Sequence, residues 1–356
     1  LPVINIATGS NIIIDTVAPT ITSITSSTAN GSYKAGDVIA IRINFSEPIT
    51  LVGTMGINLD TGGLCVINGF TGTTATGAYT VLAGHTSADL TATSVVVNTS
   101  ARDVALNNLV TTLPVTNIAT GSNIIIDSTA PTITSITSST ANGSYKAGDN
   151  ISVRINFSEP ITLVGTMGIN LDAGGVCVIS AFTGTTATGT YTVLAGHTSA
   201  DLTATSVVVN NTARDAALNN LVVTLPGTNI ATGSNIIIDT TSPTITSIVS
   251  VSPNGTYPIG ANITVRINFS EVITLVGTMG INLNTGGVAV VSAFTGTTAT
   301  GVYTVLPGHN SSALNATSIT VNSSAKDIAL NNLISTLPGI NIATGNTLVI
   351  DTIAPT

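Results

Sequence analysis

The sequence predicts an all-β protein made of consecutive β-sandwich domains, and three observations carry this prediction. The chain repeats itself at a constant interval over its whole length. Within each repeat, short runs that alternate apolar and polar residues are separated by Gly, Ser and Asn, as in strands joined by turns. No segment shows the 3.6-residue periodicity of an amphipathic helix. The chain is therefore expected to be rich in strands and nearly free of helix.

The repeat has a period of 112 residues, because Leu1-Pro2 recurs as Leu113-Pro114, Leu225-Pro226 and Leu337-Pro338. This length is too great for one unit of a solenoid and suits a sandwich domain of about 100 residues. An Asp-x-x-Ala/Ser-Pro-Thr motif marks the junctions, because its proline prevents one strand from running into the next. The predicted domains are 16–127, 128–239 and 240–351. Residues 1–15 are expected to be the last strand of an absent preceding repeat, and 352–356 the start of an absent following one.

The clearest strand is 39–46, in which Ile39, Ile41, Ile43 and Phe45 alternate with polar or small residues. Such alternation is typical of a strand with one face in a core and the other in water. The remaining strand candidates of the first repeat are 18–25, 54–59, 64–70, 75–82, 92–98 and 122–127. Seven strands of this length, separated by turns, predict three tandem immunoglobulin-like β-sandwich domains in an extended array.

Composition limits the possible functions. Only 7% of the residues are charged, against roughly 25% in typical soluble proteins. The net charge of −8 argues against nucleic acid as a partner and is compatible with cations. No apolar run approaches the roughly 20 residues of a membrane helix, so no membrane insertion is expected in this segment. Cys65 and Cys177 occupy the same place in two repeats, which predicts two buried thiols rather than a disulfide within a domain.

Three acidic positions are present in every repeat, whereas Asp37, Asp60 and Asp89 are replaced in the third. Strand alternation places the constant acids together, because the entry of the domain and the loops after its second and sixth strands lie at one end. The predicted groups are Asp15, Glu47 and Asp103; Asp127, Glu159 and Asp215; and Asp239, Glu271 and Asp327.

Three crowded carboxylates repel one another unless a cation neutralises them. Hard oxygen ligands favour Ca²⁺, with Asn107, Asn219 and Asn331 or backbone carbonyls completing the shell. Mg²⁺ demands stricter geometry, and the lack of nearby His or Cys excludes a typical zinc site. In the alternative interpretation, the acids cap turns and pair with Arg102. The sequence predicts structural calcium sites at the domain junctions.

These motifs resemble the bacterial immunoglobulin-like repeats of giant surface adhesins. The matching segments are Asp15-Thr16-Val17-Ala18-Pro19, Phe45-Ser46-Glu47-Pro48-Ile49 and Asp103-Val104-Ala105-Leu106-Asn107. The resemblance covers all three repeats and implies calcium at the junctions of an array that holds an adhesive tip away from the cell. Leu106 departs from the glycine usual in that family, which affects the backbone ligands expected from this loop.

The functional prediction is an extracellular or cell-surface stalk, stiffened by calcium, whose partners are the neighbouring repeats of the same long chain. The alternative is a subunit of a self-assembling filament, sheath or surface layer, because so few charges favour lateral self-association. His85, His197 and His309 share a turn, but no catalytic arrangement accompanies them, since the nearby Asp89 is lost in repeat three. The chain is therefore not expected to be an enzyme.

Overall fold

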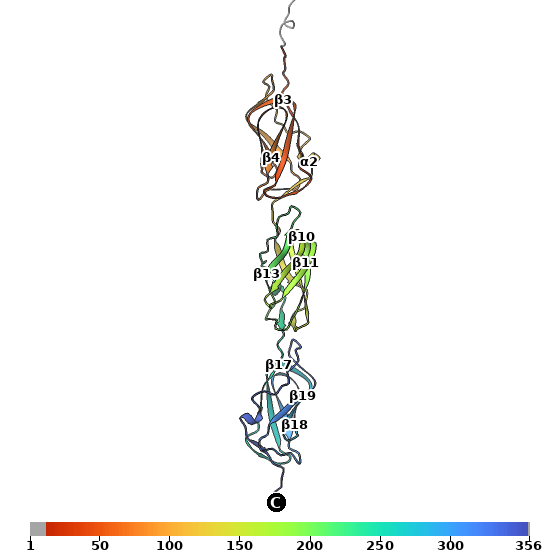
Figure 1. The fold of residues 1–356 in the computed structure, drawn as a ribbon, viewed down its shortest axis with the longest axis vertical. Coiled ribbons are helices and arrows are strands. Elements are labelled where there is room, and N and C mark those ends of the chain that lie inside the picture. The colour runs from red at the N-terminus through yellow and green to blue at the C-terminus, as the bar shows by residue number, and fades with distance from the viewer. Residues whose placement is uncertain (1–11, 355–356) are drawn as a thin grey trace, which may run out of the picture.

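The computed structural model describes residues 12–354, and strands make up nearly all of its regular structure. Strands account for 59% of the residues and helices for 3%, which confirms the all-β prediction. Figure 1 shows three β-rich bodies that follow one another along the long axis of the molecule. Within the described part of the chain, no helix has the length and apolar character needed to cross a membrane.

The order of elements is the same in the first two repeats, and the third differs in having an isolated bridge in place of the two-residue strand. A single turn of helix precedes the last strand of each repeat. The first repeat contains β1 (Ile21–Ser26), β2 (Gly31–Tyr33), β3 (Val38–Leu59), β4 (Leu64–Thr80), β5 (Thr86–Ser87), β6 (Ala92–Arg102), α2 (Ile118–Gly121) and β7 (Ile124–Asp127). The second contains β8 (Ile133–Ser138), β9 (Gly143–Tyr145), β10 (Asn150–Leu171), β11 (Val176–Thr192), β12 (Thr198–Ser199), β13 (Ala204–Arg214), α3 (Ile230–Gly233) and β14 (Ile236–Asp239). The third contains β15 (Ile245–Ser250), β16 (Gly255–Tyr257), β17 (Asn262–Leu283), β18 (Val288–Thr304), β19 (Ala316–Lys326), the 3₁₀ turn η1 (Ile342–Thr344) and β20 (Leu348–Ile350).

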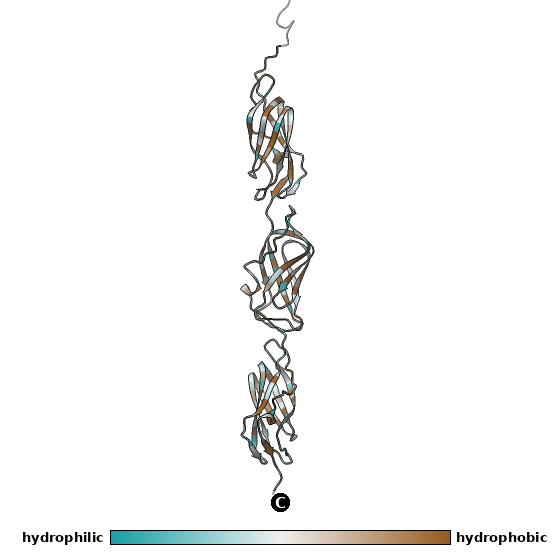
Figure 2. Cartoon of the chain, turned by 60° about the vertical axis from the view of Figure 1, so that its left-hand side comes forward, coloured by the Kyte–Doolittle hydropathy of each residue, from teal (hydrophilic) through white to brown (hydrophobic). Residues whose placement is uncertain are grey.

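Each repeat combines a large antiparallel sheet with a smaller one. In the first repeat the large sheet has the order β1-β3-β4, and β6 also pairs with β3. The smaller sheet has the order β2-β7-β5, in which β2 and β7 run parallel. Apolar and polar positions alternate along these strands, as the hydropathy colouring of Figure 2 shows. The architecture is therefore sandwich-like, with one face of each strand directed into a core.

The number of separate strands predicted for each repeat was wrong at two places. The segments 39–46 and 54–59 belong to one strand, β3, and the segments 64–70 and 75–82 lie largely within β4. The pairing of β3 with β4 shifts register between Asn44 and Ile49. Residues from both halves of this hairpin, such as Ile41 and Ile57, belong to one hydrophobic cluster. The hairpin is therefore folded over at the register shift, and its pairing resumes at Ile49, within one strand, where a loop was expected.

The three hydrophobic clusters are aliphatic and separate, and each draws all its residues from one repeat. Tyr79, Tyr191 and Tyr303 are the largest fully buried side chains. Cys65 and Cys177 are free and buried, as predicted, and burial raises the pKa of both thiols to about 11.

Residues 12–15 form no strand, and Ile12, Ile13 and Ile14 are exposed, unlike the buried Ile124 and Ile126. A strand at 124–127 exists because β7 pairs with β2 and β5 of its own repeat. Residues 12–15 have no such strands beside them in the described chain. The rest of the strand predicted at 1–15 lies outside the described residues, as do the last two residues of 352–356.

Candidate metal centres

The structure brings the three constant acids of each repeat together at its entry. The groups are Asp15, Glu47 and Asp103; Asp127, Glu159 and Asp215; and Asp239, Glu271 and Asp327. Within each group, one oxygen of every carboxylate lies within 4.8 Å of an oxygen of the other two. The late Asp is buried in every group, and the other two acids are half-buried. Two of these groups join residues of two successive repeats.

Three different elements supply the acids at the junction between the first two repeats. Asp127 is the last residue of β7 and belongs to the smaller sheet of the first repeat. Glu159 lies inside β10, in the register shift between Asn156 and Ile161 where the hairpin folds over. Asp215 follows the last residue of β13. The prediction that the Glu lies in a loop after the second strand was wrong, because this position belongs to a continuous strand.

Asn219, which was predicted to help complete the metal shell, forms hydrogen bonds to both aspartates of its group. The Asn219 amide nitrogen donates to Asp215 Oδ2 at 2.8 Å and to the main-chain oxygen of Asp127 at 2.9 Å. The Asn219 backbone N–H donates to Asp215 Oδ1 at 2.8 Å. Asn107 and Asn331 make the equivalent bonds in the other repeats. In this arrangement Asn219 orients two acids from neighbouring repeats, a role that the sequence did not reveal.

Leu106, which stands where the resembling family usually has glycine, adopts a backbone conformation that glycine favours. Leu106, Leu218 and Leu330 have φ values of 70°, 67° and 69°, a left-handed conformation that favours glycine. The leucine therefore occupies the glycine-like conformation, and the tight turn from Asp215 to Asn219 is retained. Such a conformation costs about 1–2 kcal/mol in a residue with a Cβ.

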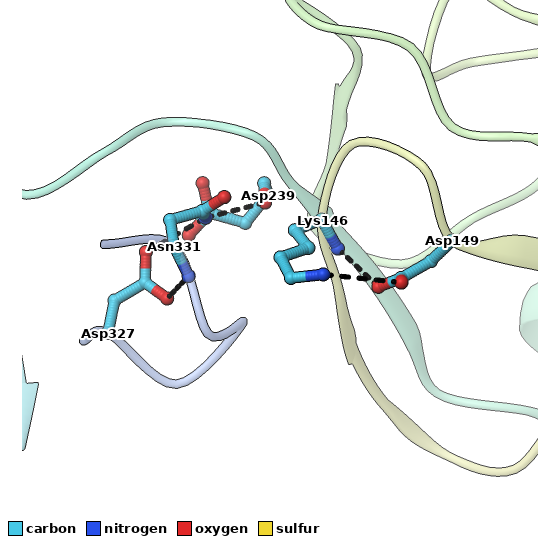
Figure 3. Close-up of polar contacts among 5 residues, drawn as sticks. All are labelled: Lys146, Asp149, Asp239, Asp327 and Asn331. Atoms are coloured by element: carbon cyan, nitrogen blue, oxygen red, sulfur yellow. Dashed lines mark hydrogen bonds and ion pairs between the residues drawn. The ribbon is translucent and has the colours of Figure 1, made fainter. Parts of the chain in front are cut away.

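No Lys, Arg or His side chain forms an ion pair with an acidic group of the junctions in the described chain. The one ion pair there joins Lys146 to Asp149, at 3.5 Å, and includes no member of a group. Arg102, the partner in the alternative interpretation, donates to Asn108 Oδ1 at 2.8 Å instead. Figure 3 shows Asp239 and Asp327 held by Asn331, with the Lys146 side chain directed to Asp149. The turn-capping part of that interpretation does hold, because Asp127 Oδ1 accepts a bond from the Thr129 N–H at 3.0 Å.

The electrostatics of the groups favour a bound cation. The pKa of Glu159 is raised by burial and by the negative charges of Asp127 and Asp215. The pKa of Glu271 is raised in the same way by burial, Asp239 and Asp327. Burial, Asp15 and Asp103 likewise raise the pKa of Glu47. Burial also acts to raise the pKa of Asp103, but hydrogen bonds from Asn107 and nearby backbone N–H groups outweigh it and lower that pKa. The Glu is thus the member whose charge is least well compensated.

The three acidic groups could each hold a metal ion, and their spacing is compatible with an ion of the size of calcium. An ion with ligands at about 2.3–2.6 Å can bridge oxygens up to about 5 Å apart, and the separations here are at most 4.8 Å. The donor set consists of carboxylates from three elements, with main-chain oxygens close by. Asp127, Glu159 and Asp215 would hold the ion, and the ion would offset the repulsion among their three carboxylates.

The raised pKa of the glutamates predicts how stability depends on pH without metal. A carboxyl group whose pKa is higher in the folded state stabilises that state below its ordinary value of 4.5, and loses this effect as the pH rises through the folded value. With a chelator present, we expect the melting temperature to rise as the pH falls from neutral towards the ordinary glutamate value of 4.5. The lowered pKa of Asp103 acts in the opposite direction, below its ordinary value of 3.8.

Circular dichroism melts at a series of pH values provide the measurement. In a variant with Glu47→Gln, Glu159→Gln and Glu271→Gln, this rise should be absent, because glutamine does not titrate. If wild type and variant show the same pH profile, the three glutamates do not carry the effect.

The repeated histidines have a structural role that the sequence did not show. The side chain of His85, in the turn that the three histidines share, is half-buried and stacks on Tyr79, with ring centroids 5.8 Å apart. The Tyr79 hydroxyl lies 2.7 Å from His85 Nδ1, and the same pair recurs at Tyr191–His197 and Tyr303–His309. A buried tyrosine needs a partner for its hydroxyl, and the histidine supplies one.

Comparison of the chain with models of known protein families finds no matching family, and no curated protein shows significant sequence similarity to it. The functional argument therefore depends on the geometry of the acidic groups and their place between repeats.

Proposed function

We propose that this chain is part of an extracellular structural stalk, made of tandem immunoglobulin-like β-sandwich domains that calcium clamps at their junctions. The observation that carries this proposal is the composition of the junction groups. Asp127 ends the last strand of one repeat, whereas Glu159 and Asp215 belong to the next. An ion shared by these acids joins two repeats and opposes rotation about the connection between them.

The connection is short and already braced by hydrogen bonds. The Ser128 hydroxyl donates to the main-chain oxygen of His85 at 2.9 Å and accepts a bond from the Gly84 N–H at 2.9 Å. Lys34 of the first repeat donates to the main-chain oxygen of Leu218 in the second at 3.2 Å. The acid-bearing turn of one repeat thus contacts a turn of the preceding repeat. Calcium would tighten an interface that direct bonds alone hold weakly.

An extracellular location agrees with the chemistry of such sites. Calcium modules outside cells commonly bind with dissociation constants of about 10⁻⁴–10⁻³ M, which suit the calcium concentrations found there. Three protein carboxylates, with solvent completing the shell, belong to this weaker class. The proposed sites would be filled outside the cell and largely empty within it.

Small-angle X-ray scattering tests whether calcium stiffens the stalk. A strand of ten residues rises about 33 Å, so each repeat with its turns should add on the order of 40 Å, and three repeats on the order of 120 Å. With calcium we expect a narrow distance distribution that extends to this length. With a chelator the junctions become hinges, and the distribution should be broader with a shorter mean.

The variant with all three glutamates changed to glutamine provides the control, since it should behave in calcium as the wild type does in chelator. Equal distributions for the wild type in both conditions would show that calcium does not stiffen the chain. A compact particle in both conditions would refute the stalk itself.

A further inference from the structure

β4 and its counterparts β11 and β18 are edge strands along their whole length. Each pairs on one side only, with β3, β10 and β17 respectively. On the other side, no backbone or side-chain hydrogen bond reaches residues 64–70, 176–182 or 288–294 from the part of the chain that the structure describes. An edge of this kind offers a row of unpaired N–H and C=O groups to another strand.

The other two edge strands of the large sheet are partly covered by the chain itself. The β1 edge donates from the Ile24 N–H to Thr116 O at 3.0 Å. The β6 edge is closed at its start by Asn117, which bonds both the N–H and the C=O of Ala92. Near its end, the Leu109 N–H donates to Ala101 O at 2.9 Å. The segment that connects β6 with β7 thus covers parts of both other edges and makes no hydrogen bond to residues 64–70 of β4.

The open edge also lacks the features that prevent strands from associating. The seventeen residues of β4 include no Asp, Glu, Lys, Arg or Pro, and the same is true of β11 and β18. Residues 176–182 read Val-Cys-Val-Ile-Ser-Ala-Phe and 288–294 read Val-Ala-Val-Val-Ser-Ala-Phe. Uncharged seven-residue segments of high β-propensity without proline are those most prone to pair with copies of themselves.

An exposed apolar patch continues from this edge onto the face of the sheet. In the first repeat, Val66 of β4 and Val96 of β6 lie opposite Gly56 of β3, one on each side. Val66 is 44% exposed and Val96 is 47% exposed, and Leu64 of β4 lies beside them at 49%. Val176, Val178 and Val208 take these places in the second repeat. A neighbouring sheet added at the β4 edge would extend this apolar face.

We infer that residues 64–70, 176–182 and 288–294 form a lateral docking surface for a second copy of this chain, through edge-to-edge β-pairing. A second copy suits the surface because it brings an equally uncharged strand whose valines continue the same patch. Each chain presents three such edges, so weak pairings add up along the molecule. The calcium groups lie at the ends of the repeats and the pairing edges along their sides, so one chain can use both. Lateral pairing would make such stalks into bundles.

Sedimentation velocity of the full chain over a range of concentrations tests this inference. The wild type should associate reversibly as its concentration rises. A variant with Val66→Lys, Val178→Lys and Val290→Lys places like charges opposite each other at every paired edge. We expect its association constant to fall by about tenfold or more. A wild type that stays monomeric throughout, or a lysine variant that associates as well as the wild type, would overturn the inference.

The matched control changes Val52, Val164 and Val276 to lysine. These valines are exposed to a similar extent, at 53%, 49% and 54%, but they lie in β3, β10 and β17, which are not edge strands. Their substitution should leave association unchanged, and an equal loss would mean that charge rather than edge pairing is responsible. Amide exchange in the associated wild type should slow along 64–70 and not along β1. Calcium is held constant throughout, so the result is independent of the proposed clamp.

Discussion

Saturating calcium is expected to raise the melting temperature of the wild-type chain by on the order of 10 °C. A ligand that binds only the folded state at 100 times its dissociation constant adds about 2.7 kcal/mol. For a domain of this size, each kcal/mol shifts the melting temperature by roughly 4 °C or more. The physical source is the relief of repulsion among Asp127, Glu159 and Asp215, whose oxygens lie within 4.8 Å of one another. Differential scanning calorimetry with calcium and with chelator measures the shift.

The triple variant Glu47→Gln, Glu159→Gln and Glu271→Gln should reverse this pattern. No hydrogen bond to the Glu159 side chain is present in the described chain, and burial and two nearby aspartates raise its pKa, so removing its charge costs no bond. We expect the variant to melt slightly above the wild type in chelator at neutral pH and to show little response to calcium.

A control variant removes carboxylates that lie outside the groups. Asp60→Asn and Asp172→Asn reproduce the third repeat, where Asn284 bonds Ser311 and Asn315 as Asp172 bonds Ser199 and Thr203. This variant should keep the full response to calcium. A wild-type melting temperature that calcium leaves unchanged would remove the metal from the proposed function.

The sequence was sufficient to predict the strand-rich fold and which acids would be neighbours. Alternation along 39–46 identified an inward face, and every second reversal of direction returned the chain to the same end of the repeat. That reasoning needs only the number of reversals, so it was insensitive to whether Glu47 lies in a loop or within a folded strand. The sequence also predicts the position of the junction, because Pro131 interrupts the chain after the last strand of the first repeat.

The hydrogen bonds around the acidic groups could not be predicted from the alternation of residue types along the sequence. The bonds of Asn219 to Asp215 and Asp127 join positions 92 residues apart along the chain in one case and four in the other. The pairing of Tyr79 with His85 depends on a turn whose shape the sequence did not define. The open edge of β4 became visible only when the partners of every strand were known. Spacing in the sequence indicates such contacts poorly, because they form only after the hairpin folds over.

The substitution Gly165→Ala should strongly destabilise the second repeat. Gly165 lies in β10 where the pairing with β11 shifts register between Leu163 and Thr166, and its φ of 84° is unfavourable for other residues. A Cβ there would overlap the main-chain oxygen of Asn210 in β13. Backbone strain of about 1–2 kcal/mol and overpacking of about 1–3 kcal/mol together give an expected loss of about 3 kcal/mol in the free energy of unfolding.

This loss should appear in calorimetry as a transition about 10 °C lower for one repeat, with the other two unchanged, because the three hydrophobic clusters share no residue. Gly233→Ala is the matched control, since Gly233 ends the short helix α3 and a Cβ there meets no atom within 4 Å. Its effect should stay within about 0.5 kcal/mol. If Gly165→Ala proved equally mild, the register shift would not depend on glycine. A shift of all three transitions together would instead show that the repeats unfold as one cooperative unit, coupled through their junctions.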